Sequence, residues 1–285
     1  MRIILSRKGF DSGVKAGGVA SPILDGKLVS LPIPGGPGEI TYNDLYFGRH
    51  SFGKIVEDLT HGRFKRSRSV HFDPDLRRGT RKRETGWRPI FGQAGAAETH
   101  LRNYGVTVGD LFLFFGWFRE VELYNGSYRY KPRAPNLHIL YGWLQVGAVL
   151  TFPERHFAKI SWADYHPHFY GAFGTVYLAS DYFRIRGQSY DLPAAGTFRN
   201  YDDLLRLTDR ESVSRGVWRL PRWFYPRGRC FPLTYHRDKA SFSRRGNYSI
   251  IKSAARGQEF VLDSREYREA ESWARRLILK AANAT

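Results

Sequence analysis

Hydrophobic positions along the chain fall partly in short apolar runs and partly at helical spacing, which predicts an α+β fold. Apolar runs at Ile3–Leu5 and Leu28–Ile33 each end in a glycine-rich turn, so both are predicted strands. A short amphipathic helix is predicted behind the cap residue Ser51. Its apolar positions are Phe52, Ile55, Val56 and Leu59.

The middle of the chain carries the strongest strand signals. Two runs are rich in aromatic and β-branched residues: one starts at Leu111 and the other spans Leu137–Leu150. A turn signal at Asn125-Gly126 lies between them. We expect two long neighbouring strands of a curved sheet. A helix over Ala94–Tyr104 is expected to precede them. Further strands are predicted at Gly174–Ser180, Tyr248–Ile251 and Glu259–Leu262.

The C-terminal segment predicts a helix capped by Asp263, with Glu266 three residues later. The apolar residues on one face of that helix are Tyr267, Ala270, Trp273, Ala274, Leu277 and Ile278. We find neither an internal repeat nor a linker. The sequence therefore predicts one domain over residues 1–285, with a curved, partly barrel-like mixed or antiparallel sheet, flanking helices and long basic loops.

Composition narrows the class of protein. A chain of 285 residues with 42% hydrophobic content can bury a sizeable core. Cys230 is the only cysteine, which excludes an internal disulfide framework and a cysteine zinc cluster and favours a reducing cytoplasm. The N-terminal apolar run is too short for a secretory signal, and no run of eighteen apolar residues occurs. We therefore expect a cytoplasmic protein without a membrane partner.

The net charge of +18 is concentrated in two stretches. The first basic stretch, His61–Pro89, has ten Lys and Arg against three acidic residues, and the second, Arg215–Arg256, has eleven against one. Charge gathered in this way attracts a polyanion through its phosphates. DNA, RNA or a nucleotide is therefore the expected partner, and the two stretches are expected to form two walls of one site.

Aromatic residues interleave with the arginines of the second stretch, a combination typical of base stacking beside phosphate contacts. Trp218, Arg219 and Gln258 are candidates for holding a nucleotide. Alternatively, Trp218 and its apolar neighbours pack into the core while the arginines point outward. The candidate phosphate-binding residues of both stretches are Arg77, Arg78, Arg81, Lys82, Arg83, Arg222, Arg244 and Arg245.

The glycine-rich turn from Gly9 to Gly18 is a second candidate for phosphate binding, because glycines let backbone N–H groups approach an anion. Its nucleotide-binding candidates are Ser12, Gly17 and Gly18, and Asp11 is a candidate catalytic group. The turn matches neither the P-loop nor the dinucleotide fingerprint. A tight turn without a ligand is the alternative.

Two groups of residues carry candidate chemistry. Asp73 and Asp75 follow His71 inside the first stretch, where they are either ion-paired with arginines or act as acid, base or Mg²⁺ ligands. Glu259, which follows Gln258, completes the catalytic candidates. The densest histidine group is either a metal site or an aromatic loop, and no metal or cofactor is assigned from it. Its members are His156, Asp164, His166 and His168.

Several of these motifs resemble the nucleotide modification associated domain family, third type, over nearly the whole chain. They are Ser6-Arg7-Lys8-Gly9-Phe10-Asp11, Gly17-Gly18, Ser21-Pro22-Ile23, His71-x-Asp73-Pro74-Asp75 and Arg256-Gly257-Gln258-Glu259-Phe260. The resemblance implies a role in bacterial or phage systems for modified DNA bases. It carries over no reaction and no catalytic residue.

A shorter similarity links Val108–Phe115 and Tyr141–Val146 to PUA-like barrels, a group that includes readers of modified bases. It implies a PUA-like β substructure around residues 105–180. The leading hypothesis is a protein that binds a nucleotide or a nucleic-acid base in a modification or recognition system. The alternatives are an enzyme of nucleotide or modified-base chemistry that uses the carboxylates, and a basic protein that binds RNA without specificity.

Overall fold

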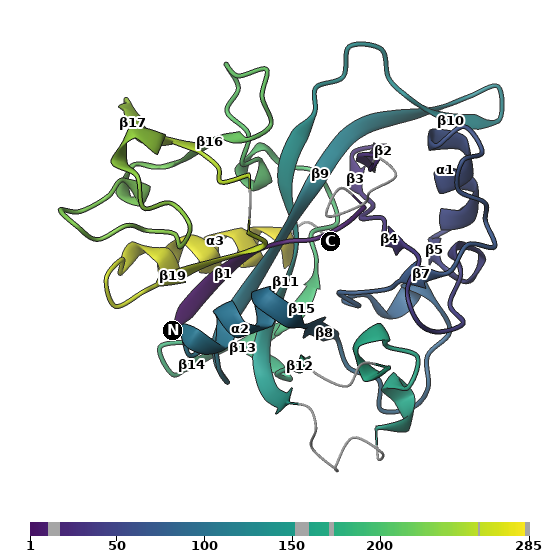
Figure 1. Cartoon of the computed structure of the whole chain (residues 1–285), viewed down its shortest axis with the longest axis horizontal. Coiled ribbons are helices and arrows are strands. Elements are labelled where there is room, and N and C mark those ends of the chain that lie inside the picture. Colours follow the sequence, from purple (N-terminus) through teal and green to yellow (C-terminus); the bar gives the residue numbers. More distant parts are fainter. Residues whose placement is uncertain (11–17, 152–159, 171–173, 256, 283–285) are drawn as a thin grey trace.

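A mixed sheet of ten strands forms the centre of the molecule in the computed structural model, which describes residues 1–10, 18–151, 160–170, 174–255 and 257–282 (Figure 1). The main path of the sheet runs in the order β19-β1-β9-β11-β12-β8. These strands are β19 (Glu259–Asp263), β1 (Arg2–Arg7), β9 (Leu111–Tyr124), β11 (Leu137–Thr151), β12 (Thr175–Ala179) and β8 (Ile90–Gln93).

The two long strands predicted from the sequence are confirmed as β9 and β11, which pair antiparallel across the middle of the sheet. The turn that leaves β9 has Asn125 and Gly126 at φ 49° and 76°, the left-handed pair that a tight hairpin requires. It leads into β10 (Ser127–Tyr130), which pairs with β9. The register between β9 and β11 shifts between Leu140 and Gly142, where a bulge bends the pair.

Parallel and antiparallel pairing meet at β1, so the sheet is mixed. β1 runs parallel to β9 and antiparallel to β19, and the second pairing sets Ser6 opposite Glu259. The described path ends at β19 and β8 without closing into a barrel. The sheet therefore gathers residues from the two ends of the chain at the carboxyl end of β1.

The other described strands are short. β2 (Ser21–Leu24), β3 (Lys27–Leu28) and β15 (Ala195–Thr197) join the main sheet. Four small sheets comprise β4 (Ile33–Pro34) with β7 (Val70–His71), β5 (Tyr46–Phe47) with β6 (His50–Ser51), β13 (Tyr182–Ile185) with β14 (Gln188–Pro193), and β16 (Val217–Pro221) with β18 (Tyr248–Lys252) and β17 (Phe242–Arg245).

The α-helices of the described chain are α1 (Phe52–Leu59), α2 (Gly95–Asn103) and α3 (Glu269–Ala282), close to the three predicted segments. The apolar face predicted for the last helix is confirmed, because all six of its residues are buried in the main core. The apolar face of α1 packs into a second core. Among the described helices, we find none whose length and hydropathy would allow it to cross a bilayer.

Two details of the predicted secondary structure are wrong. The segment Leu28–Ile33 is not one strand: the chain leaves the sheet after Leu28, and Ser21 Oγ accepts the Leu31 N–H at 3.0 Å in place of a strand partner. Asp263 does not cap the last helix either. It ends β19 opposite Arg2, so strand pairing continues to Asp263 and α3 begins six residues later.

Candidate functional site

A wide groove of about 1300 Å³ lies where β3, the β5–β6 turn, the start of η2 (Arg78–Thr80) and the chain after β15 come together. We call it the cationic groove. Asp25 is the only carboxylate among the described residues that line it. Five cations line it as well: Lys27, Arg49, Arg77, Arg78 and Arg199.

The five cations of the groove have no acidic partners within the described chain. No described carboxylate lies within 4.0 Å of any of them. The Arg77 guanidinium lies 4.1 Å from the centre of the Phe47 ring, and Arg78 lies 5.5 Å from that of Trp87. Burial and the charge of Arg199 lower the pKa of Arg77. Such crowded, unneutralised cations attract an anion.

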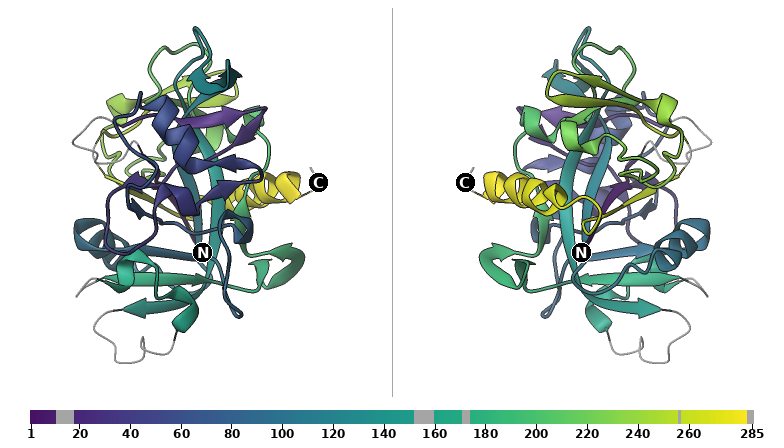
Figure 2. Two further views of the ribbon diagram at one scale, coloured as in Figure 1. Left: turned by 90° about the vertical axis from the view of Figure 1, so that its right-hand side faces the viewer. Right: turned by 90° about the vertical axis from the view of Figure 1, so that its left-hand side faces the viewer.

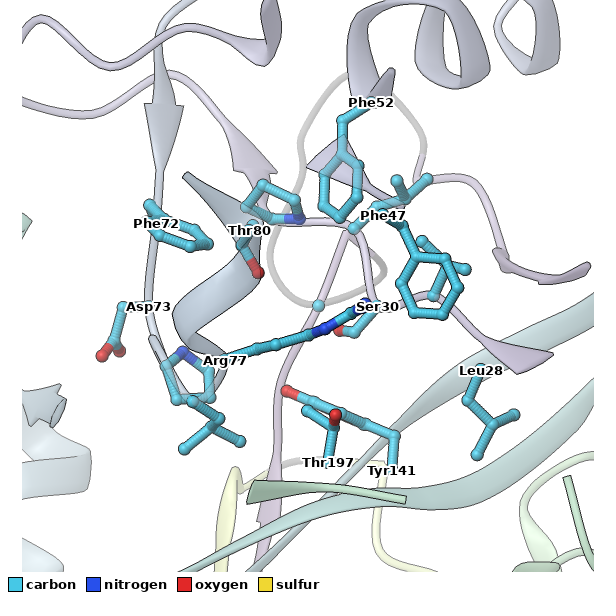
Figure 3. Close-up of a pocket in the computed structure, with 16 residues that line it drawn as sticks. Leu28, Ser30, Phe47, Phe52, Phe72, Asp73, Arg77, Thr80, Tyr141 and Thr197 are labelled. Carbon is cyan, nitrogen blue, oxygen red and sulfur yellow. The ribbon is translucent and has the colours of Figure 1, made fainter. Parts of the chain in front are cut away.

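A narrow recess of about 60 Å³ adjoins the groove and shares Arg77 with it (Figure 3). Its walls include the rings of Phe47, Phe52, Phe72 and Tyr141. The Arg77 side chain extends across it towards Ser30, and its buried Nη1 atom has no hydrogen-bond partner among the described residues. The recess thus places apolar rings around a guanidinium nitrogen that has no partner among the described residues.

A histidine–aspartate cluster lies beside the recess. Asp73 Oδ1 accepts the Gly92 N–H at 2.8 Å and His166 Nε2–H at 3.1 Å, while Oδ2 lies 3.6 Å from His168 Nε2. His71 lies close to the same ring, with 5.0 Å between the centroids of His71 and His168. The sequence grouped Asp73 with Asp75, whereas the fold groups Asp73 with three histidines.

The electrostatics of this cluster follow from its burial. Burial raises the pKa of Asp73, but the hydrogen bond from His166 and the nearby His168 ring outweigh it and hold that pKa below its usual range. Burial also lowers the pKa of His71 to about 4, against the opposing charge of Asp73. At neutral pH the cluster therefore holds a carboxylate and a neutral His71 imidazole.

Asp75 is fully buried and belongs to a different network. Its two carboxylate oxygens accept the Arg83 guanidinium in a bidentate pair at 2.5 and 2.6 Å, and they also accept Tyr165 Oη at 2.5 Å and Trp87 Nε1 at 3.3 Å. The Arg83 side chain is only 3% exposed, so its charge is paired inside the fold and not at the surface. The ion-paired alternative therefore fits Asp75 and Arg83, which leaves neither free for phosphate or substrate.

Glu259 is likewise buried at the carboxyl end of β1. Its Oε1 accepts Gln93 Nε2 at 2.7 Å, Lys8 Nζ at 3.0 Å and Ser6 Oγ at 3.1 Å. Burial raises the pKa of Glu259, and the charge of Lys8 opposes that shift. Gln258 is half-buried, and its carbonyl accepts the Arg7 N–H at 2.7 Å. Glu259 thus serves as the centre of a buried polar cluster in the described structure.

The second basic stretch, with β16 and β17, lies on the far side of β9 and β11 from α1, β4 and β7 (Figure 1), and the two views of Figure 2 face these opposite sides. The structure therefore does not bring the two stretches together as walls of one site. Trp218 is 0% exposed, and its Nε1 donates to His138 Nδ1 at 3.0 Å. Its ring packs against Phe115 and Phe260, so it offers no free face to a base.

The arginines proposed in that second stretch differ in their surroundings. Arg245 is ion-paired with Asp209 and Glu211, and Arg219 lies 3.5 Å from Asp203. Arg222 and Arg244 are exposed, and Arg244 lies 4.0 Å from the centre of the Tyr225 ring. None of these four lines the cationic groove or the recess.

The remaining candidates come from the glycine-rich turn and from the Arg81–Lys82 pair of the first basic stretch. Asp11, Ser12 and Gly17 lie outside the described residues, whereas Gly9 lines the recess. Gly18 is half-buried just after the residues left undescribed, Arg81 lies 4.3 Å from the centre of the Tyr165 ring, and Lys82 is exposed.

Sequence reasoning missed three cations of the groove. Lys27, Arg49 and Arg199 are isolated in the sequence, outside both basic stretches, so a search for runs of charge cannot find them. Only the positions of β3, the β5–β6 turn and the segment after β15 bring them to one surface.

Comparison with known proteins points to one family. The model of the family described as nucleotide modification associated domain 3 matches residues 2–263 of the chain. Comparisons with curated proteins and with solved structures found no match.

Proposed function

We propose that this chain, which belongs to the nucleotide modification associated domain 3 family, binds the phosphates of a nucleotide or nucleic acid in its cationic groove. The family name points to a nucleotide modification system. In this proposal the groove supplies the binding surface for the substrate or the recognised polymer of that system.

One observation carries the proposal. The groove combines five cations from four separate segments, and none of them has a described carboxylate within ion-pair distance. Keeping like charges together costs electrostatic energy, and an anion that neutralises them recovers it. Phosphate oxygens suit this role because guanidinium groups bind them in a bidentate manner.

One aromatic residue of the groove supports a partner that carries bases as well as phosphates. Phe47 is half-buried and lies beneath Arg77, so a stacking surface and a cation occur in the same place. Base–aromatic stacking contributes about 1–3 kcal/mol per base in single-strand binding proteins. A single strand or a nucleotide is therefore a better fit than a partner that offers phosphate alone.

The test is a binding titration over a range of salt concentrations. We would measure fluorescence anisotropy of labelled single-stranded DNA, duplex DNA and RNA with the wild-type protein and two double variants. The groove variant is Arg77→Gln with Arg78→Gln. The matched control is Arg222→Gln with Arg244→Gln, which removes two exposed arginines of the second basic stretch.

We expect the groove variant to lose affinity. The negative slope of log affinity against log salt should decrease in magnitude by about 0.9 for each duplex phosphate that is no longer neutralised. The control should retain both its affinity and its slope. Weaker binding in the control alone would place the interface on the second stretch and overturn the groove proposal. Comparing modified with unmodified oligonucleotides then separates base recognition from non-specific RNA or DNA binding.

A further inference from the structure

We propose that His71, Asp73 and His168 form a binding site for a divalent first-row transition metal ion. One ligand atom from each residue can be chosen so that all three lie within 4.8 Å of one another. Metal–ligand bonds of about 2.0–2.2 Å place the ligands of one ion roughly 3–4 Å apart. The three residues are thus already gathered, and a small inward movement of the two imidazoles completes the geometry.

The carboxylate of Asp73 is oriented for this role. Its Oδ1 is occupied by hydrogen bonds from the Gly92 N–H and His166 Nε2. Among the described residues, the nearest cationic nitrogen to its Oδ2 is His168 Nε2 at 3.6 Å, which is longer than a hydrogen bond. One oxygen is therefore fixed by the protein while the other faces the histidines, and His166 takes the position of an outer partner that orients a ligand.

The backbone beside the cluster is shaped to admit the His168 ring. A Cβ at Gly92 would lie 2.4 Å from that ring, so only glycine allows it to reach Asp73. His71, which ends β7, comes from the same short segment as Asp73, so Gly92 is what lets a third ligand join them from a distant part of the chain.

The donor set selects the class of metal. Two imidazole nitrogens and one carboxylate oxygen suit Zn²⁺, Fe²⁺ or Co²⁺, whereas Mg²⁺ and Ca²⁺ prefer sites made of oxygen. Three protein ligands leave at least one coordination position open for water or another molecule. This inference goes beyond phosphate binding, because metal uptake requires no nucleotide.

Asp73 belongs both to the proposed metal site and to the recess that contains Arg77. It lines the same recess as Arg77, and the two side chains project in different directions from one short segment (Figure 3). An ion held by Asp73 would therefore lie beside the recess, without contact between the metal and the Arg77 guanidinium.

The experiment is a metal titration of the full chain after treatment with a chelator. Co²⁺ serves as the probe because its visible absorption reports its coordination, and Zn²⁺ competes for the same site. We expect saturation at one equivalent in the wild type. His71→Ala, His168→Ala and Asp73→Asn should each weaken Co²⁺ binding by at least about tenfold, which is the smallest loss seen for residues that only support a ligand.

His61→Asn is the matched control. His61 is exposed at φ 52°, a conformation that Asn tolerates, so the change removes an imidazole with little strain. Circular dichroism would confirm that each variant folds, and Asp73→Asn is the mildest because its amide oxygen can still accept from Gly92. Absence of Co²⁺ uptake by the wild type, or uptake unchanged in all three ligand variants, would overturn the proposal.

Discussion

The two basic stretches have similar charge but different surroundings in the fold. The first contributes Arg77 and Arg78 to a groove whose cations lack described acidic partners. In the second, Arg245 and Arg219 lie beside carboxylates, and Trp218 is buried in the core. A run of charge therefore indicates a binding surface only where the fold leaves that charge unneutralised and accessible.

The same distinction applies inside the first stretch. Arg83 forms a buried bidentate pair with Asp75, although Arg78, five positions earlier, is exposed on the groove. Near neighbours in the sequence thus differ in their surroundings: Arg83 is paired inside the fold, and Arg78 lines the groove to which we assign phosphate binding as a proposal.

The largest effect is expected from breaking the buried ion pair. Asp75→Ala leaves the Arg83 charge buried without its partner, which should lower the free energy of unfolding by about 3–5 kcal/mol. Arg78→Ala, an exposed change in the same stretch, should alter it by no more than about 0.5 kcal/mol. Urea denaturation measures both. Equal stability of the two variants would contradict the distinction between a buried, paired Arg83 and an exposed Arg78.

A comparable loss of folding stability is expected from Trp218→Ala. Removing a large buried ring should lower the free energy of unfolding by about 3–5 kcal/mol. The fraction that remains folded should bind nucleic acid with wild-type affinity, because the ring has no exposed face. Denaturation and anisotropy titrations measure the two quantities. A stable variant with weakened binding would restore the stacking role for Trp218.

The stability of the protein should depend on pH through His138, the buried histidine that accepts the Trp218 Nε1–H. Burial lowers the pKa of His138 to about 3, below the 6.5 of an exposed histidine. Between those values the unfolded chain binds the extra proton, so the contribution of neutral His138 is present above pH 6.5 and declines as the pH falls. The decline amounts to about 1.4 kcal/mol per pH unit.

His138→Asn is the variant that isolates this effect, because its Oδ1 takes the place of the imidazole Nδ1 and can still accept from Trp218 Nε1. The difference in unfolding free energy between wild type and variant should shrink as the pH drops from 6.5 towards 4. Urea denaturation at several pH values measures it. A difference that stays constant would mean that His138 titrates alike in both states.

The smallest effects concern single cations of the groove. Lys27→Gln and Arg199→Gln lie outside the basic stretches, yet each should reduce the salt slope of duplex binding by about 0.9 if the residue neutralises one phosphate. Arg245→Gln, which removes an ion-paired arginine of the second stretch, should leave that slope unchanged. If Arg245→Gln had the larger effect, the roles of the two stretches would be reversed.

Much of the fold could be predicted because its signals are local. The spacing of apolar residues identified α1, α2 and the face of α3, and the aromatic runs with Asn125-Gly126 identified the β9–β10–β11 region. Errors arose where tertiary contacts decide the outcome. Strand pairing with Arg2 extends β19 through Asp263, and the Ser21 hydroxyl replaces a strand partner for Leu31.

The candidate site was less predictable. The sequence showed that His71, Asp73 and Asp75 belong to an unusual segment, but it could not show that Asp73 turns towards His166 and His168, more than ninety positions away. Nor could it join Lys27 and Arg199 to Arg77. Such groupings depend on contacts between distant segments, which no local pattern encodes.

The sequence by itself determined the net charge, the apolar periodicities and the motifs that mark the family, since these depend only on residue identity and spacing. The tertiary structure alone decided which charges are neutralised. Arg83 and Arg245 meet carboxylates, and Arg77 meets an aromatic ring and an open groove. Because electrostatic interaction depends on distance and burial, residues of the same type acquire different roles once the chain has folded.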